Sequence, residues 1–113
     1  MMRAIALPLT LMLCLSAMPG TSSAQQSLVE RGRQIAEKNC SRCHAIGRAG
    51  ESKLPIAPPL RDLPSRYPVE NLEEAFAEGI VTAHQAMPQF TFEPQQIEAL
   101  LAYIDSLGTA KKE

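Results

Sequence analysis

Apolar residues recur every three or four positions in three stretches of the chain, the spacing that places side chains on one face of an α-helix. The first stretch spans 27–40 and the second spans 69–79. The third spans 94–108 and is the clearest, because Pro94 suits a first helical turn. Its apolar stripe consists of Ile97, Leu100, Leu101, Ile104 and Leu107. No stretch alternates as a β-strand does, so the pattern predicts an all-α fold.

The ends of these stretches and the segments between them carry further signals. Ser27 and Glu30 match a capping box, so we expect the first helix to begin at Ser27. Between 45 and 68 the chain has five prolines and two glycines, which predicts an irregular loop that wraps a functional site. The segment 80–92 is predicted to be irregular as well. In the second helix, the positions expected to face the core are Val69, Leu72, Ala75 and Phe76.

The first 24 residues have the composition of an export signal. Arg3 precedes an apolar run over 4–17, which is shorter than the ~20 residues of a membrane span. Small residues follow and end at Ala24, where we expect cleavage. The sequence therefore predicts a cleaved signal peptide at 1–24, one domain at 25–113, no membrane anchor and a periplasmic location.

Cleavage at Ala24 reduces the set of residues that can bind a metal or a cofactor. Of three cysteines and five methionines in the whole sequence, two cysteines and one methionine remain, together with both histidines. A chain of 89 residues, 113 minus 24, buries only a small core and usually needs an additional stabilising group. A disulfide across two intervening residues constrains the unfolded chain too little. We therefore expect a bulky apolar group within the domain.

The stretch "NCSRCHAIG", residues 39–47, places Cys40 and Cys43 two residues apart and His44 directly behind them. Thiols at this spacing can add to the two vinyl groups of haem, and the adjacent imidazole then lies beneath the iron. Zinc is an alternative, but it would need both cysteines, His44 and His84 together. A redox disulfide of the thioredoxin type is another, but it normally follows a strand. The motif favours one covalently attached haem c.

The iron face opposite His44 needs a second donor, and few residues of the exported chain can supply one. The candidates are Met87, His84 or no protein ligand. Met87 lies in an irregular, proline-containing stretch rather than on a helical stripe, which favours a ligand over core packing. Residues that could donate hydrogen bonds to the haem propionates are Arg61, Arg66 and Tyr67.

These features together resemble the class I, mono-haem c-type cytochromes, over nearly all of the exported chain. Gly32, eight residues before Cys40, and Tyr103 in "LLAYI" are similar to the family's contact between its first and last helices. The resemblance implies a small cytochrome c fold, with three to four helices wrapped around one covalently attached haem.

The resemblance also implies roles for residues outside the Cys-x-x-Cys-His motif. "APPL" is similar to the family's Gly-Pro-x-Leu, with Ala57 in place of glycine. In that family the proline carbonyl accepts a hydrogen bond from the proximal histidine and the leucine packs on haem. This implies those roles for Pro58 and Leu60. "AMPQF" is similar to the family's Met-Pro, which implies that Met87 is the second axial ligand beside His44.

An iron with both axial positions taken has no vacancy for a substrate, so we expect an electron carrier rather than an enzyme. The expected partners are redox proteins: a donor dehydrogenase or cytochrome complex, and an acceptor oxidase or reductase. The chain is expected to be a monomer or the dedicated cytochrome subunit of a periplasmic dehydrogenase. The sequence is also compatible with a haem sensor that has an open sixth site, and with a metal-binding module without haem.

Charge is unevenly distributed along the exported chain. Residues 25–66 contain eight Lys or Arg and four acids, whereas 67–110 contain seven acids and no Lys or Arg. This asymmetry is compatible with an ordinary solvated surface, or with a dipole that orients the molecule toward an acidic partner. No aromatic residues interleave the basic ones, so nucleic acid is not an expected partner. The cations expected near the haem edge are Arg42, Arg48, Lys53 and Arg61.

Overall fold

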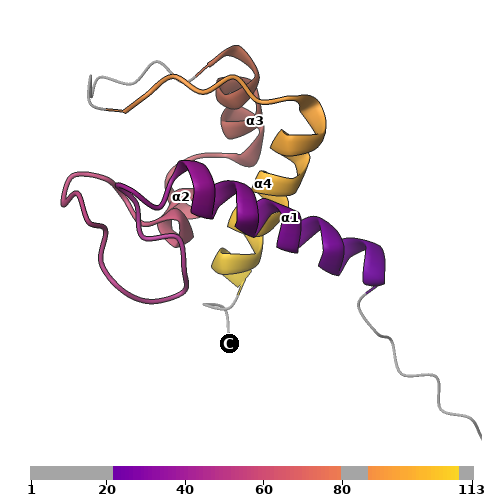
Figure 1. The fold of residues 1–113 in the computed structure, drawn as a ribbon, viewed down its shortest axis with the longest axis horizontal. Coiled ribbons are helices and arrows are strands. Elements are labelled where there is room, and N and C mark those ends of the chain that lie inside the picture. The colour runs from indigo at the N-terminus through magenta and orange to yellow at the C-terminus, as the bar shows by residue number, and fades with distance from the viewer. Residues whose placement is uncertain (1–21, 80–86, 110–113) are drawn as a thin grey trace, which may run out of the picture.

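The computed structural model describes residues 22–79 and 87–109, and within these ranges it contains helices and no strand. The elements are α1 (Ser23–Asn39), a 3-10 turn (Leu60–Asp62), α2 (Leu63–Arg66), α3 (Val69–Glu78) and α4 (Pro94–Thr109), as Figure 1 shows. The all-α prediction is therefore confirmed. The segment predicted to be irregular over 45–68 does contain the 3-10 turn and the short helix α2, which packs against α4.

Helix α1 begins earlier than predicted. Its N-cap is Ser22, whose Oγ accepts a hydrogen bond from the backbone N–H of Gln25 at 3.3 Å. Ser27 lies inside the helix and its hydroxyl donates to the carbonyl of Ala24, so the predicted capping box is wrong. On the exposed side, Arg33 bonds acidic residues one turn before and one turn after it, which stabilises the helix locally.

Helix α1 crosses α4 at very close range, and small residues make this possible (Figure 1). Gly32 and Ala36 are both buried on the face of α1 that meets α4. A Cβ atom on Gly32 would lie 1.9 Å from the carbonyl oxygen of Ala99 and 2.7 Å from Cβ of Tyr103. The backbones therefore touch at this point, and only glycine fits there.

The core consists mainly of the apolar stripe of α4. All five residues of the predicted stripe are buried, and Leu100 is fully enclosed. Helix α3 contributes Leu72 and Phe76. Val69 opens α3 and is 38% exposed, so the prediction that it faces the core is wrong. Because helical side chains point toward the N-terminus, the side chain of a first residue projects beyond the helix.

Tyr103 connects α4 to the loop that follows the cysteine motif. Its hydroxyl donates to the carbonyl of Ile46 at 2.6 Å, while its ring is 7% exposed. Burial raises the pKa of the phenol, which keeps it a neutral donor at physiological pH. This bond fixes the end of the motif segment against the last helix.

A chain of aromatic rings anchors the segment before α4. Phe92 meets Phe76 of α3 edge-on, with ring centroids 5.9 Å apart, and Phe90 stacks on Phe92 at 5.6 Å. These contacts hold the residues that follow Met87 against the core. None of the helices within 22–79 and 87–109 combines the length and apolar composition of a membrane-spanning segment.

Candidate functional site

The two cysteines and the histidine of the motif lie on one turn of chain at the end of α1. The N–H of Cys40 donates to Ala36 O at 2.8 Å, and the N–H groups of Cys43 and His44 both donate to Cys40 O, at 3.2 and 2.9 Å. Both cysteines are free thiols and partly buried. The turn therefore presents two sulfurs and one imidazole from a rigid helix end.

The thiol chemistry differs from that of a redox-active pair. Burial raises the pKa of the Cys40 thiol to about 11, so the free thiol is protonated at neutral pH. Catalytic Cys-x-x-Cys pairs have the opposite property, a thiol with a lowered pKa. Within the described residues, no three Cys, His, Asp or Glu side chains are grouped as metal ligands. His84, which the zinc alternative requires, lies outside the described residues.

One ring nitrogen of His44 is bonded to the protein, which leaves the other as the metal-binding atom. Nδ1 lies 2.6 Å from the carbonyl oxygen of Pro58. A carbonyl can only accept, so Nδ1 carries the proton and Nε2 carries the lone pair in the neutral ring. Metal-binding histidines have this arrangement, in which the second nitrogen donates to a carbonyl and the ring gains basicity.

The predicted residues of the "APPL" stretch lie beside the motif. The N–H of Leu60 donates to the carbonyl of Ala45 at 2.9 Å, and Leu60 itself is 4% exposed in the core. Ala57 is also buried, and Pro58 is partly buried. The structure therefore brings together the motif, Pro58 and Leu60.

The other predicted residues make different contacts or are exposed. Met87 is partly buried in the irregular segment that Phe92 anchors, and its role as a ligand stays a prediction. Arg61 turns toward the loop, where Nη2 donates to Gly50 O at 2.8 Å and Nη1 is buried without a hydrogen-bond partner among the described residues. Arg66 and Tyr67 are exposed.

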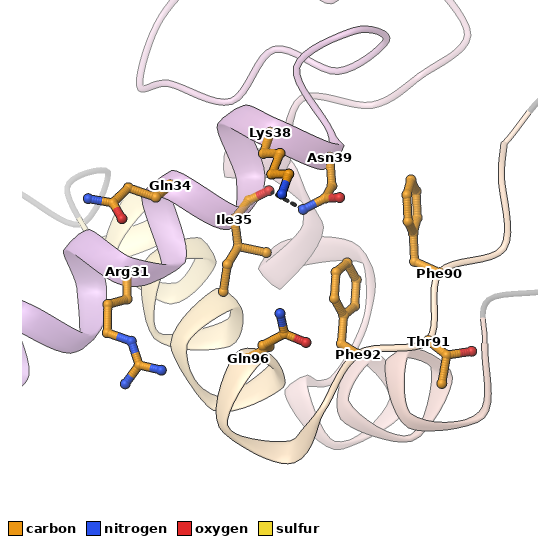
Figure 2. Close-up of a pocket in the computed structure, with 9 residues that line it drawn as sticks. All are labelled: Arg31, Gln34, Ile35, Lys38, Asn39, Phe90, Thr91, Phe92 and Gln96. Carbon is orange, nitrogen blue, oxygen red and sulfur yellow. Dashed lines mark hydrogen bonds between the residues drawn. The ribbon is translucent and has the colours of Figure 1, made fainter.

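A surface cavity of about 480 Å³ lies between α1 and the segment 90–96 (Figure 2). Ile35, Phe90 and Phe92 supply its apolar wall, and Lys38 lies at its edge. It includes none of the predicted site residues. Asn39, which directly precedes Cys40, is nevertheless among its lining residues, so the cavity adjoins the start of the motif.

Comparison with known proteins supplies the family. A family model described as cytochrome c matches residues 29–108, which include the motif, the "APPL" stretch and Met87. The chain belongs to the cytochrome c family. Neither the curated proteins nor the solved structures gave a match. This cytochrome c has the small all-α fold of the class I members and the covalently attached haem c of its family.

The residues of this cytochrome c fit that cofactor. Two free thiols are spaced for thioether formation, and the adjacent imidazole has one nitrogen bonded and one free. Sequence reasoning found these residues from their spacing. It missed Ser52, whose hydroxyl bonds the backbone next to His44, because a bond across a seven-residue loop leaves no periodic signal.

Proposed function

We propose that this cytochrome c is a periplasmic electron-transfer protein whose haem iron has His44 and Met87 as axial ligands. The observation that carries the proposal is the bond from His44 Nδ1 to Pro58 O, because it occupies one ring nitrogen and leaves Nε2 for the iron. Haem supplies a one-electron couple when it is bound. Partners are redox proteins, a donor dehydrogenase or cytochrome complex and an acceptor oxidase or reductase.

The chain's own residues have distinct tasks in this proposal. Cys40 and Cys43 hold the group covalently, and the Pro58 carbonyl accepts a hydrogen bond from His44 Nδ1, which orients the ring. Leu60 and Phe76 are buried in the core against which Cys40 and Ile46 pack. They therefore exclude water from that side of the motif. Met87 supplies a thioether, which stabilises ferrous iron relative to a second imidazole and implies a fairly high potential.

Visible absorption spectra of the exported protein, oxidised and dithionite-reduced, test the proposal. We expect sharp bands after reduction and a weak near-red band in the oxidised form, which reports sulfur ligation. Haem should remain with the polypeptide after acid denaturation, because thioethers survive it. A colourless protein from cells with working cytochrome maturation would contradict the proposal and return Cys40 and Cys43 to zinc or disulfide chemistry.

Salt should slow electron transfer to an acidic partner. Arg42, Arg48 and Lys53 are exposed on or after the motif, whereas Arg61 is bonded to Gly50 O and is less available than the sequence predicted. We expect the second-order rate to fall by on the order of tenfold between low salt and about 0.5 M, because screening removes electrostatic steering. Stopped-flow mixing with an acidic redox protein measures it.

A matched pair of variants localises this effect. Arg42→Glu should lower the rate at low salt several-fold. Arg31→Glu makes the same change of charge on α1, nine residues before Cys40 and so about 13 Å along the helix axis, and should have a smaller effect. Equal effects of the two variants, or a rate indifferent to salt, would argue against docking through the motif region.

A further inference from the structure

The loop after the motif folds back and bonds to the residues on either side of the proximal histidine. The N–H of Leu54 donates to Cys43 O at 3.1 Å, and the N–H of Leu60 donates to Ala45 O at 2.9 Å. His44, between them, donates from its ring to the same loop. Three consecutive residues are therefore held by one loop.

One side chain of this loop takes part in holding the backbone. The hydroxyl oxygen of Ser52 accepts a hydrogen bond from the N–H of Ala45 at 2.9 Å, in a partly buried position. The other bonds from the loop to the peptide groups of residues 43–45, within the described structure, come from backbone atoms. Among these bonds to the peptide groups of residues 43–45, the bond to Ser52 is therefore the one that a substitution can remove without altering the backbone.

The turn that presents Ser52 is itself fixed. Gly50 has a φ of 92°, which reverses the loop two residues before Ser52. Arg61, just beyond the "APPL" stretch, donates from Nη2 to Gly50 O at 2.8 Å. Two side chains thus fix the loop: Ser52 bonds the backbone of the motif, and Arg61 bonds the turn at Gly50.

The bond from Ser52 acts on the orientation of His44. The N–H of Ala45 belongs to the peptide unit that includes the carbonyl of His44, so Ser52 fixes the plane attached to the His44 Cα. The Pro58 carbonyl fixes the ring at Nδ1. With the backbone and the ring held from the same loop, the imidazole has little freedom to rotate away from Pro58.

We propose that Ser52 is a positioning residue for the proximal ligand, which keeps the His44–Pro58 hydrogen bond short. The inference rests on the proposed function, because it takes His44 as an iron ligand. A strong bond from Nδ1 raises the basicity of Nε2, and a more basic ligand favours ferric iron. Ser52 therefore lowers the reduction potential, although it touches neither the iron nor the ring.

The experiment compares serine variants of the haem-loaded, exported protein. In Ser52→Ala, we expect the His44 Nδ1 proton of the reduced form to exchange with solvent about fivefold to tenfold faster, as a weakened hydrogen bond allows. The midpoint potential should rise. Proton exchange is followed by NMR, and the potential by spectroelectrochemical titration. Ser52→Thr keeps the hydroxyl and should restore both values.

Ser65→Ala is the matched control, because the Ser65 hydroxyl donates to Asp62 O at the start of α2 and not to the motif. It should leave both the exchange rate and the potential unchanged. If Ser52→Ala fails to retain haem, Arg61→Lys loosens the Gly50 turn more mildly and should shift both quantities in the same direction.

Two results would overturn the inference. One is a Ser52→Ala protein that loses stability but keeps the wild-type exchange rate and potential, since the hydroxyl then only closes the loop. The other applies if Ser52→Ala does not retain haem. In that case, an Arg61→Lys protein with the wild-type exchange rate and potential would overturn the inference. Failure of the proposed function is seen separately, in the spectrum of the wild-type protein.

Discussion

The Gly32→Ala variant is expected to lose about 3 kcal/mol or more of its free energy of unfolding, a large share of the stability of a small domain. The added Cβ would lie 1.9 Å from Ala99 O and 2.6 Å from Ala99 C. Both are backbone atoms of α4, so no side-chain rotation can relieve the overlap. The helices must separate, and the core residues between them lose contact.

Denaturant unfolding followed by circular dichroism measures this loss. Gly47→Ala is the matched control, because a Cβ there would meet only Ala49 O at 3.9 Å and its φ lies outside the left-handed region. That variant should be within about 0.5 kcal/mol of the wild type. Similar midpoints for the two variants would show that α1 and α4 can move apart at little cost, contrary to the packing described.

The Met87→Ala variant should keep its haem but lose its sixth ligand. We expect the near-red band of the oxidised form to disappear and carbon monoxide to bind the reduced form. The reduction potential should fall by on the order of 0.1 V, a fraction of the range that axial ligands set. Visible spectra and a redox titration measure these changes. The polypeptide should remain folded, because Met87 is only partly buried.

His84→Ala is the companion variant, because it removes the other candidate ligand by the same truncation. It should leave the near-red band in place. If the wild type lacks the band, Met87→Ala leaves its spectrum unchanged and His84→Ala changes it, the sixth ligand is the histidine. If neither variant changes the spectrum, the iron is open in the wild type, and a haem sensor becomes the better explanation.

Local periodicity accounts for most of what the sequence predicts correctly. The stripe of α4 from Ile97 to Leu107 repeats every three or four residues, and each member is buried. The motif is equally local, because its chemistry depends on the short spacings between Cys40, Cys43 and His44. Such signals need no knowledge of the rest of the chain.

The errors arise where a stronger signal masks a weaker one. The cap at Ser22 lies inside the predicted export signal at 1–24, so the sequence places the start of α1 about one turn too late. The density of prolines over 45–68 conceals α2, although Pro64 occupies its first turn, where proline is tolerated. The bond from His44 to Pro58 spans fourteen residues, and only the resemblance to a family implies it.

The contact of Phe92 with Phe76 limits how far Met87 can travel. Met87 is five residues from Phe92, so its backbone stays within ~17 Å of that anchor even when fully extended. A thioether confined to such a volume has an effective concentration in the millimolar range or above. If Met87 is the sixth ligand as proposed, a free ligand of equal intrinsic affinity for the iron must exceed that concentration to displace it, so the aromatic anchor favours rapid religation whenever the sulfur leaves the iron.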